Sequence, residues 1–409
     1  MRSELAEAAS VRGRRVVTPG EAELRQGTPK DAAPASATKK LGTLQAPIDL
    51  ERTVAQPRSE PLYGALRLVA PGTPLREGID RILQAKMGAL IVVGDAPEVL
   101  NICSGGFLLD AEFTPQRLSE LAKMDGAIIL ASDGTRVARA NVHLVPDPDI
   151  PTTETGTRHR TAERVARQIE VPVFTVSEEM GVVSVHYRGH KRTLVAIPRV
   201  LARADQALQI LGRYKTRLDG VTGALSALEV EDLVTLRDVS TVLQRAEMVR
   251  RIADEIEGYV VELGDDGRLV ELQLEELTGG VEDDRRLVGR DYFIEAEHRS
   301  LDDVTTQLSE LPDEDLLDLR TVAGLLGLSP DLDLDSSVQP RGYRLLNKIP
   351  RLPESIADHV IERFGRLPKI MRASISDLVG VEGVGEARAR AIKDGLARVA
   401  ESSILDRYS

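Results

Sequence analysis

The sequence predicts an α/β N-terminal domain with a mixed sheet flanked by helices, then an all-α spine domain, then a C-terminal domain of short helices. Three observations predict this order. Before residue 198, short apolar segments typical of strands alternate with segments whose apolar residues have helical spacing. The middle of the chain has long, highly charged segments with helical periodicity, and the segments after residue 340 are short and separated by glycine and proline. Residues 1–57 are rich in Ala, Pro and Thr without an apolar period, which predicts a disordered extension. We therefore expect domains at 58–197, 198–340 and 341–409.

The composition is that of an ordinary globular chain with aliphatic cores. Of 409 residues, 42% are hydrophobic but only 3% are aromatic, and Trp is absent. Cys103 is the single cysteine, so no intrachain disulfide can form, and there is no CxxC metal cluster. Nothing resembles a signal peptide, and no stretch reaches the roughly 18 apolar residues of a membrane span. These features predict a cytoplasmic protein without a membrane partner.

Charge is spread unevenly along the chain, whose net charge is −12. Residues 221–340 hold 30 acidic and 10 basic residues, a net of −20. Residues 341–409 hold 13 basic and 9 acidic residues, a net of +4. Such asymmetry indicates modules with different partners, because the acidic middle would repel nucleic acid and the tail would not.

In the predicted α/β domain, periodicity distinguishes helices from strands. Helical spacing marks 73–86, 115–124 and the segment from about 158. Strands are expected at 88–94, 99–106, 126–132, 136–144, 171–177, 182–188 and 192–197. Residues 198–335 have long helical periodicity with dense charge, and the segment from Gly342 contains two related units of helix, turn and helix.

Three basic or ionisable residues stand together where the helix from about 158 begins. Arg158, His159 and Arg160 follow Thr157, which is a plausible N-cap, and precede Thr161. Cations at this end oppose the helix dipole, and a bound polyphosphate would explain them because free N–H groups and Arg forks both suit phosphate oxygens. The alternative is a solvated basic turn that pairs with surface acids.

A carboxylate and two small residues precede the predicted strand 126–132. Asp125 lies at a junction of helix and strand, before Gly126 and Ala127. A carboxylate there can hold Mg²⁺ or Mn²⁺ while a nucleotide lies against the backbone. The alternative is a common Asp-Gly turn.

Other stretches are weaker indications. The pair of glycines in SGGF (104–107) allows close approach of a ligand or simply a tight turn, and Ser177 either reaches a phosphate or caps a turn. The chain has no G-x-x-x-x-G-K-[ST] motif and no G-x-G-x-x-G opening a helix after a strand, which argues against P-loop and Rossmann sites.

The stretch VGVEGVGEARARAIKDGL near the C-terminus has the pattern of a helix-hairpin-helix. Gly383, Val384 and Gly385 precede a helix with an Ala/Ile face, and Arg388 and Lys393 lie on that helix. Glycine there lets backbone N–H groups meet a DNA phosphate at a helix N-terminus. Such contacts read the backbone rather than bases, which favours recognition of DNA shape. The alternative is a glycine-rich connection within a helical bundle.

These stretches occur together and in order: SGGF, AKMDGAIIL, ANVHLVPDPDIPTTETGTRHRTAERVA, LEVEDLVTLRDV and a terminal hairpin. In that combination the chain resembles the DNA-integrity-scanning diadenylate cyclases of bacteria, over residues 60 to about 400. The DGA and RHR triplets are the hallmarks of that family and both are intact.

The resemblance implies an activity and an assembly. Two ATP molecules condense to cyclic di-AMP with release of two pyrophosphates, with Mg²⁺ or Mn²⁺. Two cyclase domains face each other, each holding one ATP, in what the resemblance implies is a homo-octamer. Branched DNA such as a four-way junction binds the hairpin domain and inhibits synthesis, so the protein is expected in the cytoplasm, at the nucleoid while it scans DNA.

The resemblance also implies roles for individual residues. Asp125 would bind the divalent ion and take part in catalysis with Arg158, His159 and Arg160. The ATP-binding set would be Gly126, Ala127, Leu144, Thr157, Arg158, His159, Arg160, Thr161 and Ser177. The DNA-binding set would be Gly383, Val384, Gly385, Arg388 and Lys393.

Two other functions stay open at this point. A DNA-binding protein could use the nucleotide fold to sense a ligand without chemistry, although Asp125 and the RHR triplet are intact. A helix-hairpin-helix nuclease would need a carboxylate cluster with metal spacing, for which Asp147 and Asp149 come closest in a Pro-rich loop.

Overall fold

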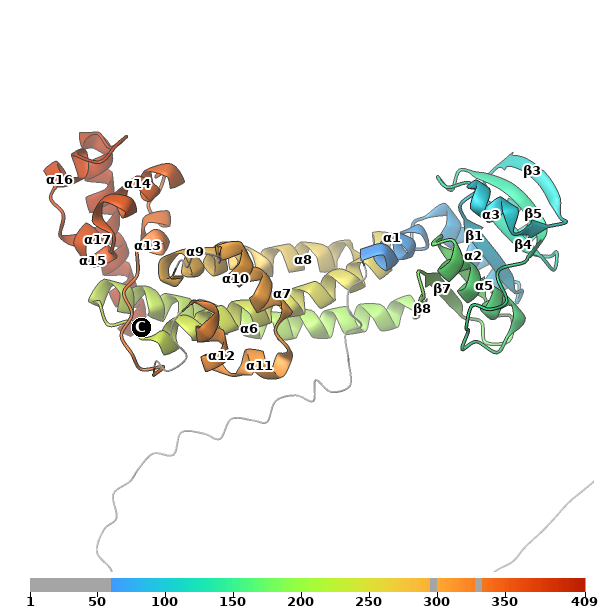
Figure 1. Ribbon diagram of the computed structural model, residues 1–409, viewed down its shortest axis with the longest axis horizontal. Helices are drawn as coiled ribbons and strands as arrows, with labels where there is room; N and C mark the ends of the chain where they lie inside the picture. The colour runs from blue at the N-terminus through green and yellow to red at the C-terminus, as the bar shows by residue number, and fades with distance from the viewer. Residues whose placement is uncertain (1–59, 295–299, 328–332, 409) are drawn as a thin grey trace, which may run out of the picture. The chain divides into compact units, whose positions relative to one another are not determined.

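A computed structural model describes residues 60–294, 300–327 and 333–408 of the chain (Figure 1). The predicted disordered extension, 1–57, lies outside the described residues. The elements follow the predicted order, with a mixed α/β region first, long helices next and short helices last. The predicted fold class is confirmed to that extent.

The α/β region is built on one sheet in the order β2-β5-β4-β1-β6-β7-β8, with β3 also paired to β5. Strands β1 and β4 run parallel, and the other pairs are antiparallel. The strands are β1 Ala89–Val93, β2 Cys103–Ser104, β3 Phe107–Glu112, β4 Ala127–Leu130, β5 Arg136–Leu144, β6 Val173–Val176, β7 Val183–Tyr187 and β8 His190–Thr193.

Helices cover both faces of this sheet because its central strands are apolar on both sides. Ile91 and Phe174 face a layer formed by α1, α2 and α4, whereas Leu90 and Val173 face α3 and α5. These helices are α1 Glu60–Leu68, α2 Pro74–Gln84, α3 Pro97–Asn101, α4 Pro115–Leu121 and α5 Thr157–Gln168. The result is a three-layer domain in which α5 lies on the face formed by alternate residues of β1, β4 and β6.

Two predicted strands had the wrong bounds, and one strand was missed. Most of the predicted strand 99–106 is helix α3 followed by the short β2, because Pro97 supplies a favourable first helical residue. The predicted strand 192–197 ends early, since β8 pairs with β7 across a turn at Gly189 and α6 has begun by Ile197. Strand β3, whose side chains are mostly exposed, was not predicted.

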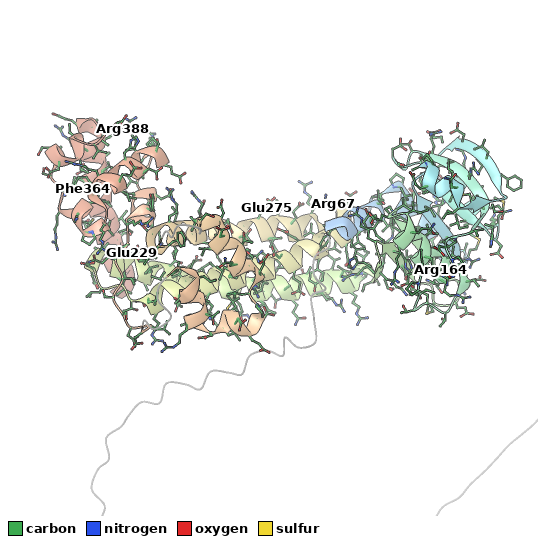
Figure 2. All side chains as sticks on the ribbon, in the orientation of Figure 1. Arg67, Arg164, Glu229, Glu275, Phe364 and Arg388 are labelled. Carbon is green, nitrogen blue, oxygen red and sulfur yellow. The ribbon has the colours of Figure 1, made fainter. Side chains whose placement is uncertain are left out.

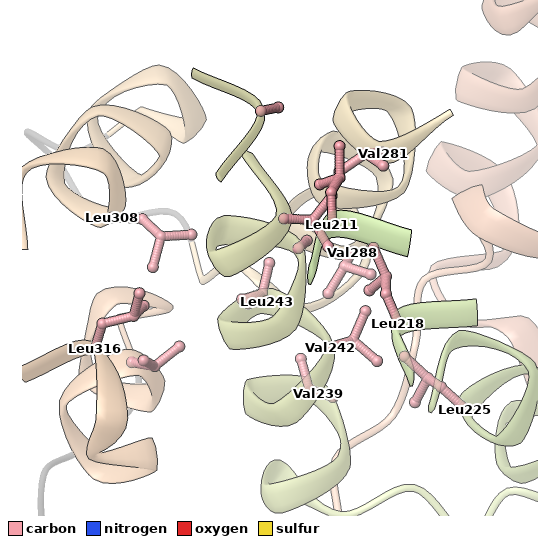
Figure 3. Packing of buried hydrophobic residues seen from close by; sticks show 14 of the residues in the cluster. Leu211, Leu218, Leu225, Val239, Val242, Leu243, Val281, Val288, Leu308 and Leu316 are labelled. Carbon is pink, nitrogen blue, oxygen red and sulfur yellow. The ribbon is translucent and has the colours of Figure 1, made fainter. Parts of the chain in front are cut away.

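The middle of the chain is helical, as predicted, with the two longest helices, α6 and α7, packed along each other. Leu211, Leu218 and Leu225 recur every seven residues on α6 and share one buried cluster with Val239 and Val242 of α7 and Val288 of α9 (Figure 3). The elements here are α6 Ile197–Glu231, α7 Leu236–Leu263, η2 Gly264–Gly267, α8 Arg268–Thr278, α9 Val281–Tyr292, α10 Leu301–Glu310, α11 Asp313–Leu317 and α12 Leu319–Leu325.

The C-terminal helices contain an internal repeat. The helices are α13 Tyr343–Asn347, α14 Glu354–Phe364, α15 Leu367–Arg372, α16 Ile375–Val379 and α17 Glu386–Tyr408. The amide of Ile349 donates to the carbonyl of Leu346 at 3.0 Å, and the amide of Val381 donates to that of Leu378 at 3.1 Å. All four side chains are buried in the same core. The turns before α14 and α17 therefore have equivalent backbones.

The repeat aligns Arg351 with Gly383, and both have left-handed backbones, with φ of 61° and 76°. Glycine adopts this conformation freely, whereas an L side chain raises its energy by roughly 1–2 kcal/mol. A Cβ at Gly383 would also lie 2.7 Å from Cδ1 of Ile356. The first turn thus carries strain that the second avoids.

We expect Arg351→Gly to stabilise the C-terminal helices by up to about 1 kcal/mol, because glycine relieves the strain but adds entropy to the unfolded chain. Urea denaturation, with hydrogen–deuterium exchange of peptides from α14 and α17, measures the change. Arg363→Gly, in the exposed last turn of α14, is the matched control and should destabilise by about 1 kcal/mol. Equal destabilisation by both substitutions would contradict the strain argument.

Candidate active site and nucleic-acid interface

The sheet brings the predicted nucleotide-binding residues to one of its edges. Ala127, at the start of β4, lies beside Leu90 of β1, and Ala89 lies opposite Val176 at the end of β6. Leu144, at the end of β5, pairs with Cys103 of β2. The starts of β1 and β4 and the ends of β5 and β6 therefore lie at the same edge of the sheet, where the strands begin or end. Helix α5 also begins there.

Asp125 and Arg158 meet at this edge in an ion pair of 2.9 Å between Oδ1 and Nη2. The Asp125 side chain is 95% exposed, whereas the Arg158 side chain is 37% exposed. The Arg158 guanidinium lies on Gly88, just before β1, where a Cβ atom would be 2.1 Å from Nη1. Gly88 thus provides the space that lets Arg158 reach Asp125.

Gly126 is required by the sheet itself. A Cβ on Gly126 would lie 2.5 Å from the carbonyl carbon and 2.6 Å from Cα of Asn141 in β5. Asn141 has a left-handed backbone, φ 56°, where the pairing of β4 and β5 shifts register. Ala127, the next residue, is buried in the core under α5. The glycine therefore permits close packing of β4 on the bulge in β5.

Helix α5 begins one residue earlier than predicted. The N-cap is Gly156, so Thr157 is the first helical residue and the predicted N-cap was wrong. The amide of Arg160 donates to the carbonyl of Gly156 at 2.9 Å, and no side chain caps the helix. The amides of the first turn are thus left for water or a ligand, which favours an anion.

Arg158 and His159, the first two residues of the triplet, make polar contacts with other side chains of the domain, whereas Arg160 makes none in the part of the chain that the structure describes. Nδ1 of His159 lies 3.1 Å from Oγ1 of Thr175 on β6. Burial lowers the pKa of His159 below its ordinary value; Glu154 opposes the shift, while Lys191 and Arg158 add to it. Arg160 is exposed and makes no ion pair within the described residues.

Further along α5, polar side chains hold the loop that leads into the helix. Arg164, labelled in Figure 2, donates to the carbonyl of Ile150 at 2.9 Å, and Arg167 donates to that of Pro151 at 2.7 Å. Glu163 is buried and accepts from the Thr152 hydroxyl at 2.5 Å. These residues hold the loop before α5 and so position the start of the helix, which gives them a structural role.

Leu144 and Ser177 lie at the same edge but offer different groups. The Leu144 side chain is buried, so only its backbone can face a ligand. Ser177 Oγ accepts from the amide of Met180 at 3.3 Å in the turn after β6. Thr161, on the second turn of α5, is half-buried.

Sequence reasoning missed four contributors to this edge. Gly88 and Thr175 contact Arg158 and His159, and Glu154 pairs with Lys191 at 2.6 Å beside them. The contact of Gly88 has no local sequence signal. Thr175 does have one, because a polar residue occurs at an inward position of an apolar strand.

Residues 380–385, where the sequence predicts the hairpin, connect α16 to α17. Val384 is buried, and a Cβ on Gly385 would have nothing within 4 Å. Arg388, labelled in Figure 2, donates to the carbonyl of Gly383 at 2.6 Å. Lys393 donates to the carbonyl of Met371 at 2.8 Å, so a phosphate would have to compete for its ammonium group. Gly385 is therefore the open point of the hairpin.

Neither a protein-only metal centre nor a membrane span occurs among the described residues. No group of three or more His, Cys, Asp or Glu side chains there could hold a metal ion. Asp149 donates its amide to Oδ1 of Asp147 at 2.9 Å, which makes this acidic pair a turn. None of the described helices is long and apolar enough to cross a membrane.

An uncapped helix N-terminus with three basic or ionisable side chains, beside an exposed carboxylate, suits a nucleotide triphosphate with a divalent ion. The fold and this edge define a nucleotide-binding α/β domain. Residues 76–191 match the family model described as DisA bacterial checkpoint controller nucleotide-binding, and residues 194–334 match that described as DisA bacterial checkpoint controller linker region.

Similar proteins cover the chain more fully. It is 55% identical over 358 residues to the DNA integrity scanning protein DisA of Frankia alni, covering 87% of this chain and all of the relative. The proteins of the same name from Acidothermus cellulolyticus and Streptomyces coelicolor are 56% and 55% identical over 352 residues, 85% of this chain and 96% and 94% of theirs. The chain therefore belongs to the DisA family of bacterial checkpoint controllers, and it is a diadenylate cyclase.

The contact between Gly88 and Arg158 gives a testable consequence. We expect Gly88→Ala to displace the guanidinium from Asp125 and to reduce cyclase kcat/KM about tenfold or more, because the guanidinium is the flexible end of the side chain. The melting temperature should change little. If Gly88 acts only through Arg158, the variant with both Gly88→Ala and Arg158→Ala should be no less active than Arg158→Ala alone. Additive losses would show that Gly88 acts through another contact.

Proposed function

We propose that the described sheet edge condenses two ATP molecules into cyclic di-AMP and two pyrophosphates, and that branched DNA bound by the C-terminal helices lowers this activity. One observation carries the first part: the 2.9 Å pair of Asp125 and Arg158 joins an exposed carboxylate to the N-terminus of α5. The DNA integrity scanning name of the relatives supports an interaction with DNA, and the inhibition by branched DNA is what the family resemblance implies.

In this proposal the phosphates of ATP lie on the first turn of α5. Free amides and the guanidinium of Arg160 bind phosphate oxygens, and Arg158 stabilises the charge that develops at the α-phosphate and on the departing pyrophosphate. The backbone at Leu144 contacts adenine. The remaining ATP contacts come from Gly126, Ala127, Thr157, His159, Thr161 and Ser177.

A divalent ion, Mg²⁺ or Mn²⁺, fits the residues present. Mg²⁺ is normally held by one or two carboxylates together with substrate phosphates. Asp125 is such a carboxylate, and its high exposure leaves room for a nucleotide and water. The bound ion would neutralise phosphate charge, while Asp125 would orient the 3′-hydroxyl and accept its proton.

Each site holds half of the reactants, so the proposal needs two protomers. The 3′-hydroxyl of each ATP attacks the α-phosphate of the other, which requires two cyclase domains that face each other. We propose that these pairs belong to a homo-octamer, and that the protein acts in the cytoplasm, at the nucleoid while it scans DNA.

The DNA contact proposed here is the hairpin before α17. Gly385 has open space at its Cβ position, so a phosphate can approach the backbone amides at the start of this long helix. Arg388 adds charge beside the turn. Gly383 and Val384 hold the turn in shape, through a left-handed backbone and a buried side chain respectively. Lys393 would join this contact after releasing the carbonyl of Met371.

The other two functions have less support. A ligand sensor without chemistry would not need Asp125 joined to the α5 triplet. A nuclease would need a carboxylate cluster, and none occurs among the residues that the structure describes. Incubation of labelled branched DNA with protein and metal would detect cleavage directly.

For the cyclase, we expect cyclic di-AMP from ATP with Mg²⁺ or Mn²⁺, identified by mass spectrometry. Asp125→Asn should reduce the rate about 100-fold or more, because it removes the charge that holds the ion and accepts the proton. Changing both Arg158 and Arg160 to Ala should abolish synthesis and leave junction binding intact. An ATP-binding protein that forms no cyclic product with either metal would support the sensor function instead.

For the DNA contact, we expect Gly385→Ala to weaken binding of a four-way junction about tenfold, because a methyl group would keep the phosphate from the amides. Fluorescence anisotropy measures the affinity. Synthesis without DNA should be unchanged, and more junction should be needed to inhibit it. Gly220→Ala is the matched control, since its Cβ position in α6 is also open. Equal junction affinity for both variants and the parent would rule out Gly385 as the contact.

A further inference from the structure

Three polar side chains lie buried under the start of α5. Thr175 of β6 and Ser184 and His186 of β7 are at most 2% exposed, and they alternate with apolar residues that face the other side of the sheet. An apolar side chain at each position would suit the layer between sheet and helix better, because burying a polar group lowers stability unless it is hydrogen-bonded. The presence of three buried polar side chains at these positions therefore needs an explanation.

Thr175 lies between the two histidine rings. Its Oγ1 is 3.1 Å from Nδ1 of His159 and 3.5 Å from Nε2 of His186, and the ring centroids are 6.2 Å apart. Nδ1 of His186 is buried without a hydrogen-bond partner among the described residues. The rings are thus connected by one hydroxyl group, which has one proton to donate.

That single proton makes the tautomers of the two rings interdependent. If Thr175 donates to His186, then His186 carries its own proton on Nδ1, a buried donor without an acceptor. If Thr175 donates to His159, then Nε2–H of His186 donates to Thr175, and the unpaired Nδ1 of His186 is only an acceptor. Buried unpaired N–H groups are rarer than under-satisfied acceptors, so the second arrangement is favoured.

We propose that Thr175 and His186 are positioning residues that hold His159 neutral with its proton on Nε2, so that His159 donates a hydrogen bond to the phosphates of ATP. The proposal rests on the proposed binding of ATP at α5. It assigns His159 a role distinct from that of its neighbours, because a neutral donor directs a phosphate oxygen without adding charge. Thr175 and His186 act through His159 and do not touch ATP.

The surrounding charges are consistent with neutral rings. Burial lowers the pKa of His186 to about 4 and also lowers the pKa of His159. Lys191 of β8 lowers both values, and Arg158 lowers that of His159. Glu154, in the loop before α5, opposes the shift at both rings. Glu163 opposes it at His186, and the net shift of the pKa at both rings favours the neutral form.

The test compares Thr175→Val with Thr175→Ser in the full-length protein. Valine keeps the shape and the strand preference but removes the hydroxyl, whereas serine keeps the hydroxyl. We expect Thr175→Val to lower kcat for cyclic di-AMP synthesis about 10- to 100-fold, the range seen when partners that orient metal-bound imidazoles are removed. Thr175→Ser should stay within about threefold of the parent, and KM for ATP should change less than kcat.

The pH profile separates positioning from a merely structural role. The Thr175 hydroxyl bonds to the neutral form of His159, so its removal should raise the pKa of His159. Activity needs the neutral ring and is lost as pH falls through that pKa, so the acid limb for Thr175→Val should move to higher pH. Equal kcat and an unshifted limb in Thr175→Val would overturn the proposal.

A second pair of variants guards against a folding defect in Thr175→Val. Gln at position 186 keeps a donor close to the place of Nε2, and Leu removes it. We expect His186→Gln to retain more activity than His186→Leu, and the reverse order or equal activity would count against the proposal. Junction binding and melting temperature report whether each variant is folded. A parent protein that makes no cyclic di-AMP would instead refute the proposed function.

Discussion

The ion pair between Asp125 and Arg158 is the contact on which the site depends, and it forms only where three chain segments meet. Asp125 precedes β4, Arg158 begins α5, and Gly88 precedes β1 and leaves space for the guanidinium. The parallel pairing of β1 with β4 brings Gly88 and Asp125 to the same edge. An exposed pair of this kind contributes little to stability, so its value is in orientation: it directs Arg158 toward the carboxylate that would hold the divalent ion.

Local periodicity predicted much of the fold because buried strands and amphipathic helices have regular signals. The strand at 88–94 and the helix from 158 appear close to their predicted bounds. The N-cap was misplaced by one residue, since Thr157 and Gly156 are both acceptable caps and the choice depends on how the preceding loop is held. The roles of Gly88 and Thr175 could not be predicted from local pattern, because each depends on a residue distant in sequence.

Another set of distant contacts attaches the C-terminal helices to the long helices. Asp291, at the end of α9, accepts backbone amides at the start of α13, from Gly342 at 2.6 Å, Tyr343 at 2.7 Å and Arg344 at 2.9 Å. Arg344 pairs with Glu229 of α6 at 2.6 Å, and Tyr292 donates to the same carboxylate at 2.8 Å. Burial and the charge of Glu229 raise the pKa of Asp291 to about 7. The joint is polar, buried and densely hydrogen-bonded.

Such a joint resists separation because pulling it apart would leave charges buried and unpaired. Removing one partner of a buried ion pair typically costs about 3–5 kcal/mol, so the contact between α13 and α6 is expected to be firm. Helix α6 runs without interruption from Ile197, just after β8, to Glu231, beside this joint (Figure 1). Its 35 residues span about 50 Å, and Glu229 lies in its last turn. One continuous helix therefore extends from the residues that follow β8 to the joint.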